Sequence, residues 1–261
     1  MSLAIITGAS SGIGREFAKQ MKEKLGVSEF WFIARRRENM EALRDELGVK
    51  AKIIPADLTS QGGIEAVRAA LNEERPEVDY LVNAAGFGTF GAFDELPEKE
   101  IAAMIDLNVK ASVLITHMVV PFMRRGGRIV MLGSGSCFTP LPYFNTYSSG
   151  KVFILHYTKS LNFELKRYGV RATCFCPGWV ETEFLPKSLA SGNPHPKKMS
   201  PLLKCDKVVA TCLKAVKRGK TMCVTGLYTK FQHLLFKIVP DKILTKIWLG
   251  MLVYPDKESE E

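Results

Sequence analysis

Apolar residues along the chain follow two patterns that alternate. Short β-branched runs, typical of buried strands, are separated by longer segments in which apolar residues recur at helical spacing. The runs predict strands over residues 3–7, 29–34, 51–55, 78–82, 127–132, 170–176 and 222–225. The longer segments predict helices over residues 15–24, 39–47, 64–72, 99–123 and 146–168. Such alternation is typical of βαβ units, so we expect an α/β fold with a doubly wound parallel sheet.

The predicted strands all lie in residues 1–226, which we expect to form one domain. Within it, residues 183–203 are rich in Pro, Ser, Lys and Gly and predict a long mobile loop. Residues 227–254 predict a C-terminal helical extension of two amphipathic helices, separated by Pro240, with Asp241 as a candidate N-cap. Residues 255–261 form an acidic tail.

Positive charge is concentrated in one third of the chain. The net charge is +9 over 261 residues, and residues 187–246 hold 13 Lys and Arg against only Asp206 and Asp241. This excess favours an anionic partner, such as a phosphorylated cofactor or substrate or a membrane surface, although it equally suits a solubilising surface. Charge alone, without a recognition motif, does not predict nucleic-acid binding.

Cysteine usage and the N-terminus indicate an intracellular protein. The six cysteines form no C-x-x-C pair and have no ligand-spaced histidine, so we expect reduced core thiols and no metal site. The chain enters an apolar strand at Leu3 without the charged leader and long apolar run of a secretory signal. We therefore expect a cytoplasmic location.

A glycine-rich turn follows the first predicted strand. In "TGASSGIG", Gly8, Gly12 and Gly14 stand directly before a predicted helix. Glycines let a turn tighten and let a pyrophosphate approach backbone amides at a helix N-terminus, where the helix dipole favours negative charge. This placement predicts dinucleotide binding.

Tyr147 precedes Lys151 by four residues in a predicted helix, so both side chains lie on one helix face. Alone, this spacing arises often by chance in a lysine-rich chain. Together with the glycine-rich turn and the motifs that follow, however, it resembles the short-chain dehydrogenase/reductase family over residues 3–225. The family's Asn-Asn-Ala-Gly motif has its counterpart in "NAAG", where Ala84 replaces the second asparagine. The family's other motif residues correspond to Asn108, Ser134, Tyr147, Lys151, Pro177, Gly178 and Thr182.

The resemblance implies a single Rossmann-type domain and a catalytic set of Asn108, Ser134, Tyr147 and Lys151. A free phenol has a pKa of about 10, and a nearby ammonium favours the phenolate, so we expect Lys151 to lower the pKa of Tyr147. Tyr147 would then exchange a proton with a carbonyl or alcohol, and Ser134 would hydrogen-bond the same oxygen. Ser136 is the alternative to Ser134.

The residues after the second strand indicate the cofactor. In "FIARRREN", the positions directly after the strand are Ala34, Arg35, Arg36 and Arg37, with no acid among them to bind a ribose 2′-hydroxyl. Guanidinium groups suit a 2′-phosphate, so we expect NADP(H), with Arg35 as the first candidate to bind that phosphate. Asp57 matches the family's adenine-contacting aspartate and could equally cap the following turn. The full cofactor-binding set that we expect is Gly8, Ser10, Ser11, Gly12, Ile13, Gly14, Arg35, Arg36, Asp57, Leu58, Asn83, Ala84, Ala85, Gly86, Tyr147, Lys151, Pro177, Gly178, Val180 and Thr182.

Aromatic residues around these motifs suggest a pocket for a bulky apolar ketone or alcohol. In this respect the chain resembles hydroxysteroid dehydrogenases and long-chain 3-ketoacyl reductases. They are Phe87, Phe90, Phe93, Phe138, Tyr143, Phe144, Trp179 and Phe184. The alternative functions are a non-catalytic NADPH-binding regulator and an epimerase or dehydratase. The resemblance also implies a homodimer that pairs through the helices predicted over residues 99–123 and 146–168.

Residues 227–254 leave two interpretations open. Apolar stripes are predicted at Phe231, Leu234, Leu235 and Ile238, and at Ile243, Leu244, Ile247, Trp248, Met251 and Leu252, each beside lysines. The helices are too short to span a bilayer. In the first interpretation, which we favour, the helices close over the substrate pocket or pack on a partner subunit. In the second, they make a peripheral membrane contact.

Overall fold

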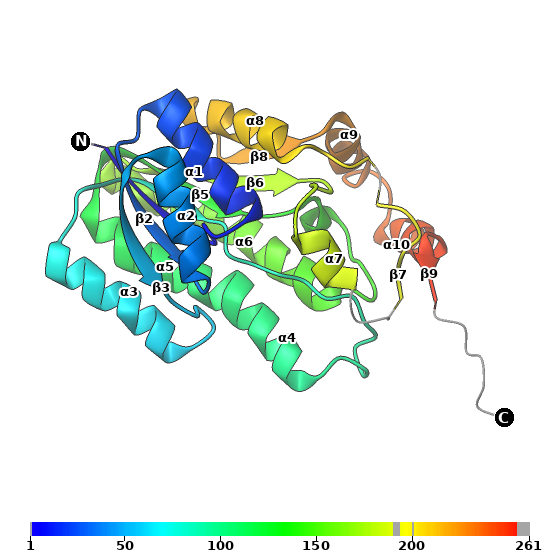
Figure 1. The fold of residues 1–261 in the computed structure, drawn as a ribbon. Helices are drawn as coiled ribbons and strands as arrows, with labels where there is room; N and C mark the ends of the chain where they lie inside the picture. Colours follow the sequence, from blue (N-terminus) through cyan, green and yellow to red (C-terminus); the bar gives the residue numbers. More distant parts are fainter. Residues whose placement is uncertain (1, 190–193, 200, 255–261) are drawn as a thin grey trace.

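The computed structural model describes residues 2–189, 194–199 and 201–254 (Figure 1). Its centre is a seven-stranded sheet in the order β3-β2-β1-β4-β5-β6-β8, in which every neighbouring pair is parallel. The predicted doubly wound parallel sheet is therefore confirmed. The strands are β1 (Leu3–Thr7), β2 (Glu29–Ala34), β3 (Lys50–Pro55), β4 (Val78–Asn83), β5 (Met123–Leu132), β6 (Arg171–Pro177) and β8 (Met222–Thr225).

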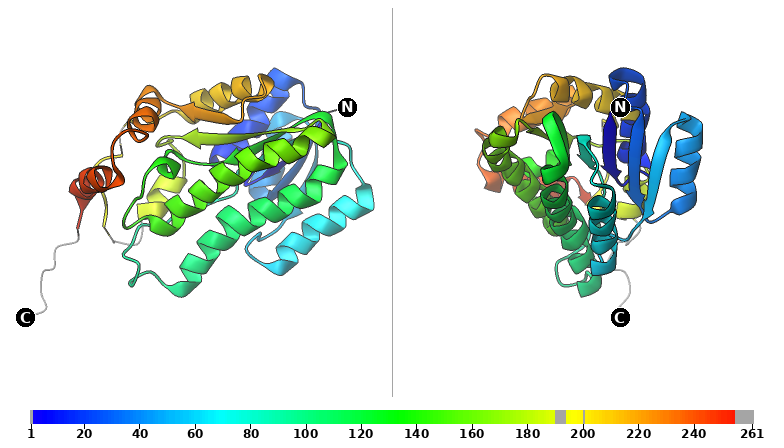
Figure 2. Two further views of the ribbon diagram at one scale, coloured as in Figure 1. Left: turned by 180° about the vertical axis from the view of Figure 1, so that it is seen from behind. Right: turned by 90° about the vertical axis from the view of Figure 1, so that its left-hand side faces the viewer.

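Helices cover both faces of the sheet (Figure 2). One face packs against α3 (Gln61–Glu74), α5 (Ser112–Val119) and α6 (Asn145–Glu164). The other packs against α1 (Gly12–Leu25), α2 (Arg37–Leu47) and α8 (Cys205–Lys217). Successive residues of a strand point to opposite faces of the sheet. Ile5 therefore packs in the core under α3, α5 and α6, and Ile6 packs in the core under α1, α2 and α8. Burial on both faces is why central strands such as β1 and β2 are nearly continuous apolar runs.

The helix predicted over residues 99–123 is divided into four pieces. They are α4 (Glu98–Ile105), the π-helical turn η1 (Asp106–Ala111), α5, and the 3₁₀ turn η2 (Val120–Phe122). β5 then begins at Met123, which pairs with Val78, so the predicted strand started too late. The stretch Glu98–Phe122 is long and apolar enough to cross a membrane, but Ile115 and Val119 are buried against the sheet.

The predicted loop over residues 183–203 contains regular structure. It includes α7 (Phe184–Leu189) and β7 (His195–Pro196), which pairs antiparallel with β9 (Leu252–Val253). Pro186 does not prevent α7, because proline is tolerated in the first turn of a helix. The segment therefore contains secondary structure that its composition did not predict, and its mobility stays a prediction. Residues 190–193 and 200 lie outside the described chain.

The extension forms the two expected helices, α9 (Leu227–Leu235) and α10 (Asp241–Gly250). They lie beyond the carboxyl ends of the sheet strands (Figures 1 and 2). Pro240 is the N-cap of α10 and Asp241 is its first residue, so the predicted cap was one position late. The acidic tail, residues 255–261, lies outside the described chain.

The cysteines behave as expected from the sequence. All six are free, five of them are buried, and Cys205 is partly buried.

Candidate active site

The glycine-rich turn forms a backbone cradle at the carboxyl edge of the sheet. Gly8 and Gly12 have φ angles of +69° and +52°, in the left-handed region that favours glycine. A Cβ on Gly14 would lie 2.3 Å from the carbonyl oxygen of Gly8. A Cβ on Gly8 would lie 2.8 Å from the backbone nitrogen of Ala85. The turn therefore leaves the N-terminus of α1 open to a phosphate group.

Thr7 fastens this cradle to the turn after β4. Its hydroxyl oxygen accepts hydrogen bonds from the backbone N–H groups of Ala84 and Ala85, at 3.1 and 3.2 Å. Sequence reasoning did not single out Thr7, although it ends the first strand directly before the glycine motif. Thr7 thus holds two cofactor-binding turns at a fixed separation.

Asn83 does not reach the cavity with its side chain. Its amide nitrogen donates to the hydroxyl of Thr116 on α5 at 2.9 Å, and the residue is buried. The expectation that Asn83 contacts the cofactor is therefore not supported by the geometry. Its side chain instead joins β4 to α5.

One cavity of about 740 Å³ brings nearly all other predicted site residues together. It runs from the glycine turn and the arginines after β2 to the inner surfaces of α9 and α10. Of the residues expected to bind cofactor, it is lined by Gly8, Ser10, Ser11, Gly12, Ile13, Gly14, Arg35, Arg36, Asp57, Leu58, Ala84, Ala85, Gly86, Tyr147, Lys151, Pro177, Gly178, Val180 and Thr182. Asn83 is missing from the expected cofactor-binding set, and of the four predicted catalytic residues Asn108 does not line the cavity.

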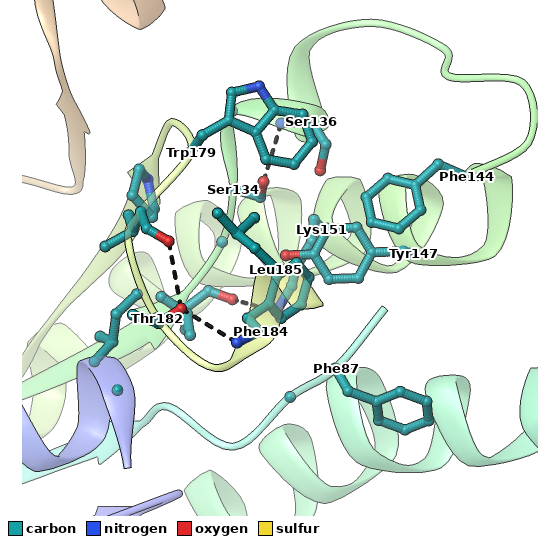
Figure 3. A pocket seen from close by; sticks show the side chains of 18 of the residues that line it. Phe87, Ser134, Ser136, Phe144, Tyr147, Lys151, Trp179, Thr182, Phe184 and Leu185 are labelled. Atoms are coloured by element: carbon teal, nitrogen blue, oxygen red, sulfur yellow. Dashed lines mark hydrogen bonds between the residues drawn. The ribbon is translucent and has the colours of Figure 1, made fainter. Parts of the chain in front are cut away.

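Tyr147 and Ser134 meet inside this cavity (Figure 3). Tyr147 comes from the first turn of α6, and Ser134 is the N-cap of the short 3₁₀ turn η3 (Gly135–Phe138). The Ser134 hydroxyl hydrogen-bonds the phenol of Tyr147 and accepts from the backbone N–H of Ser136 at 3.1 Å. The hydroxyl of Ser136 has no hydrogen-bond partner within the described residues. The geometry thus favours Ser134 over Ser136.

Lys151 is buried beside Tyr147, one helical turn further along α6. Its ammonium donates to the carbonyl oxygen of Leu132 at 2.8 Å and lies 5.3 Å from the centroid of the Tyr147 ring. Burial lowers the pKa of Lys151 to about 8. Burial also raises the pKa of Tyr147, a shift that the hydrogen bond from Ser134 only partly opposes.

The predicted lowering of the Tyr147 pKa by Lys151 is therefore wrong for this structure. Loss of solvent around the phenol is the main cause of the rise in its pKa, because burial disfavours the phenolate. Tyr147 is accordingly protonated at neutral pH. In that state it is a proton donor, which suits the reduction of a carbonyl.

Asn108 approaches Lys151 from the π-helical turn η1. Its amide nitrogen donates to the carbonyl oxygens of Phe87 and Met104, at 2.7 and 2.9 Å. Its buried side-chain oxygen has no partner within the described residues. A Cβ on Gly86 would lie 2.5 Å from this oxygen and 3.5 Å from the Lys151 ammonium, so both groups face the same small space. A water molecule there would connect them.

Gly88 is a site residue that sequence reasoning missed. A Cβ at this position would lie 2.6 Å from a ring carbon of Tyr147 and 2.9 Å from the Phe144 ring. Glycine is therefore needed for Tyr147 to adopt its position. The only signal in the sequence is a second glycine two residues after Gly86.

The basic end of the cavity holds Arg35 and Arg36. Arg36 donates to the Ser10 hydroxyl at 3.4 Å and forms an ion pair of 3.1 Å with Glu183. Asp57 accepts from the backbone N–H and the hydroxyl of Thr59, at 3.0 and 2.8 Å. Asp57 therefore caps its turn, and because it also lines the cavity, the adenine contact stays a prediction.

The other end of the cavity is apolar. Four of the eight aromatic residues expected there line it, namely Phe87, Phe144, Trp179 and Phe184. Phe90 is instead buried in the core beneath, and Phe93 is exposed. Leu141, Leu185, Leu244, Trp248 and Met251 complete much of this apolar surface.

The extension is attached directly to the catalytic segments. Thr229 of α9 packs closely on two glycines of these segments. A Cβ on Gly178 would lie 2.4 Å from the Thr229 hydroxyl oxygen, and a Cβ on Gly135 would lie 2.9 Å from the Thr229 methyl group. The indole N–H of Trp248 on α10 donates to the carbonyl oxygen of Pro142 at 2.9 Å. These contacts and the cavity lining support the interpretation of the extension as a lid.

Comparisons with known proteins agree with this geometry. The family model described as short chain dehydrogenase matches residues 2–191. A serine 3-dehydrogenase of Agrobacterium fabrum is 35% identical over 186 residues, which cover 69% of this chain and 72% of that protein. A putative ketoacyl reductase of Streptomyces coelicolor is 36% identical over 188 residues, covering 69% and 71%.

Among solved structures, a short-chain dehydrogenase from Sphingobium yanoikuyae in complex with NADPH is similar over the whole chain. It is 26% identical, and the match covers 100% of this chain and 99% of that one with a TM-score of 0.76.

Proposed function

Because the chain belongs to the short-chain dehydrogenase/reductase family, we propose that this oxidoreductase uses NADP(H) to interconvert a ketone and a secondary alcohol on a bulky apolar substrate. The observation that carries the proposal is the position of the buried phenol of Tyr147. The phenol is hydrogen-bonded to Ser134 inside a cavity with a glycine cradle at one end and apolar walls at the other.

The residues of the site divide the work among them. Tyr147 donates a proton to the carbonyl oxygen during reduction, and Ser134 holds the same oxygen by a hydrogen bond. Lys151, together with Asn108, supplies a route by which Tyr147 regains its proton. The lowered pKa of Lys151, about 8, suits such a transfer near neutral pH.

The cavity fits a nicotinamide dinucleotide. Side chains at Gly8 or Gly14 would collide with the backbone that shapes the cradle, and the buried Asn108 oxygen and the Lys151 ammonium both face the small space beside Gly86. The cofactor, when bound, supplies or accepts the hydride. The protein binds its phosphates at the N-terminus of α1 and keeps water from the reacting carbon by the apolar wall.

The choice of NADP(H) rests on Arg35 and Arg36. Both line the cavity, and positions 34–37 directly after β2 hold no acidic residue that could bind a free ribose hydroxyl. The Sphingobium yanoikuyae relative, described in complex with NADPH, supports the same choice. The Glu183 carboxylate forms an ion pair with Arg36, so a 2′-phosphate would compete with Glu183 for this guanidinium group.

A bulky apolar substrate, steroid-like or fatty-acyl-like, suits the other end. Phe144, Trp179, Phe184 and Trp248 present large apolar surfaces around the Tyr147 hydroxyl. The relative described as a putative ketoacyl reductase supports a ketone on an acyl chain.

The test follows NADPH absorbance with purified protein and a panel of steroid ketones and long-chain 3-ketoacyl thioesters. Tyr147→Phe removes the transferable proton, so we expect turnover to fall by at least about a hundredfold. Its Kd for NADPH, measured by fluorescence, should stay within about threefold of wild type, because the cradle is unchanged. Near-wild-type turnover by this variant would refute the mechanism.

The alternative functions are separated by the same panel. NADPH binding without turnover on any ketone or alcohol would favour the non-catalytic regulator. Loss of water or inversion of a centre without net NADPH consumption would favour the dehydratase or epimerase.

We further propose a homodimer formed through α4, α5 and α6, in a cytoplasmic protein. Exposed apolar side chains on these elements support the interface, among them Ile105, Phe153 and Phe163. Sedimentation velocity tests it, since Phe153→Asp should convert a dimer to a monomer. A wild-type monomer at micromolar concentration would refute it.

A further inference from the structure

The outer surface of α9 and α10 is the largest concentration of exposed apolar residues in the described chain. Ten of its seventeen large exposed apolar side chains lie within residues 227–254. On α9 and the turn that follows, Leu227, Phe231, Leu234 and Ile238 are 87%, 62%, 60% and 78% exposed. Their spacing of four, three and four residues places them on one helix face.

α10 carries a second stripe of the same kind. Ile243, Ile247 and Met251 are exposed at intervals of four residues. Their inward neighbours Leu244 and Trp248 are buried, so the exposed stripe is not required to hold the helix in place. We call the outward side chains of both helices the outer apolar face.

The outer apolar face surrounds the mouth of the cavity. Phe231, Ile247 and Met251 are exposed to solvent and also line the cavity. Both helices lie at the end of the molecule beyond the carboxyl ends of the strands (Figures 1 and 2). Anything that covers this face therefore stands at the entrance of the active site.

Positive charge accompanies the outer apolar face. Lys230, Lys237, Lys242 and Lys246 are exposed, and in residues 2–189, 194–199 and 201–254 none of them forms an ion pair. Asp241 is the only acidic residue between 227 and 254. The positive charge also acts on His233 of α9, whose pKa is lowered first by burial and then by the charges of Lys237 and Lys159.

A second copy of the chain fits this face poorly. A two-fold contact brings the same patch of both subunits together, so these lysines would face one another. An anionic bilayer, in contrast, accepts apolar side chains at the level of its acyl chains while lysines reach its headgroups. We propose that the outer apolar face docks the protein on an anionic membrane surface, with the cavity mouth turned toward the lipid.

The docking does not depend on the proposed activity. If that activity is correct, a lipophilic ketone could enter the cavity directly from the bilayer. Lipid binding is measured without turnover, so its failure and failure of the proposed function are distinguishable.

The test is flotation of the purified full chain with phosphatidylcholine vesicles that contain or lack phosphatidylglycerol. We expect binding to the anionic vesicles, weakened by salt. In the variant Lys237→Glu, Lys242→Glu, Lys246→Glu, binding should fall about a hundredfold, because each lysine near such a surface contributes about fivefold.

The matched control is Lys207→Glu, Lys214→Glu, Lys217→Glu on α8, which makes the same change in net charge outside the outer apolar face. It should retain most of the binding. A second variant, Leu234→Gln with Ile238→Gln, should lose binding at an unchanged Tm, because both side chains are exposed and outside the cavity.

Several results would overturn the proposal. They are no flotation of the wild type at low salt, equal binding to neutral vesicles, or equal loss of binding in the two lysine variants. A wild-type dimer that Leu234→Gln with Ile238→Gln dissociates would also overturn it, since a second copy would then cover the face.

Discussion

The buried Lys151 should lower the stability of the fold in which it acts. Burial lowers its pKa from 10.5 to about 8, and at 1.36 kcal/mol per pKa unit this amounts to roughly 3 kcal/mol. The unfolded chain binds this proton more tightly than the folded one. The cost is therefore complete below pH 8 and disappears as the pH rises from 8 to 10.5.

The perturbation is Lys151→Met, which keeps the length of the side chain and removes its charge. The substitution also deletes the hydrogen bond to the carbonyl oxygen of Leu132, at a cost of about 1–2 kcal/mol. We therefore expect a net gain of about 1–2 kcal/mol at pH 7. In Tm this corresponds to a rise of about 2–4 °C.

The assay is thermal or urea unfolding of both proteins without added nucleotide, at pH 7 and at about pH 9.5. At the higher pH most of the charge penalty of the wild type is relieved, so the advantage of the variant should shrink to about zero. The control is Lys159→Met, an exposed lysine on the same helix, which should change stability by less than about 0.5 kcal/mol. A lower Tm for Lys151→Met at pH 7, or a difference independent of pH, would refute the reasoning.

Three further predictions concern the cofactor and the catalytic tyrosine. Arg35→Asp should lower kcat/KM for NADPH relative to NADH by about tenfold or more, because a carboxylate that repels the 2′-phosphate replaces a guanidinium that binds it. An unchanged ratio would exclude Arg35 as the residue that binds the 2′-phosphate. Glu183→Gln should tighten NADPH binding by up to about fivefold and leave NADH unchanged, because the half-exposed ion pair no longer occupies Arg36. Titration fluorescence measures both constants, and equal effects on the two cofactors would contradict this competition. Gly88→Ala should lower kcat by about tenfold or more and NADPH affinity little, because its Cβ meets the Tyr147 ring; Gly62→Ala, with open space around it, is the control.

The parallel sheet could be predicted because its central strands β1, β2, β4 and β6 are largely buried on both faces. Such strands are largely apolar runs that stand out between amphipathic segments. The remaining errors lie where the signal is short or ambiguous. β7 and β9 are two residues each and far apart in sequence, so no local pattern marks their pairing.

The break of the long helix at η1 was hidden for a different reason. Apolar residues continue at nearly helical spacing through Asp106–Ala111, so the pattern does not distinguish a π-helical turn from an α-helix. The turn is nevertheless what presents Asn108, whose amide nitrogen donates to Phe87 and Met104.

The candidate site shows which properties a motif carries and which it does not. Spacing brought Ser134, Tyr147 and Lys151 into one cavity, because residue order fixes which strand ends and helix faces meet. Spacing did not report burial, and burial decides the direction of the Tyr147 pKa. Nor did the motif report that Asn83 turns toward α5, since neighbouring residues of a strand end point to opposite faces.

The extension illustrates how one apolar pattern can serve two surfaces. In sequence, Ile243, Leu244, Ile247 and Trp248 belong to a single broad stripe, which suggested either a lid or a membrane contact. The structure divides the stripe, because residues one apart on a helix differ by about 100° in direction. Leu244 and Trp248 turn inward, while Ile243 and Ile247 stay exposed beside the cavity mouth. The apolar stripe is wider than the surface that packs on the protein core, so part of it stays exposed. The same helices can therefore close the pocket with one side and face a lipid surface with the other.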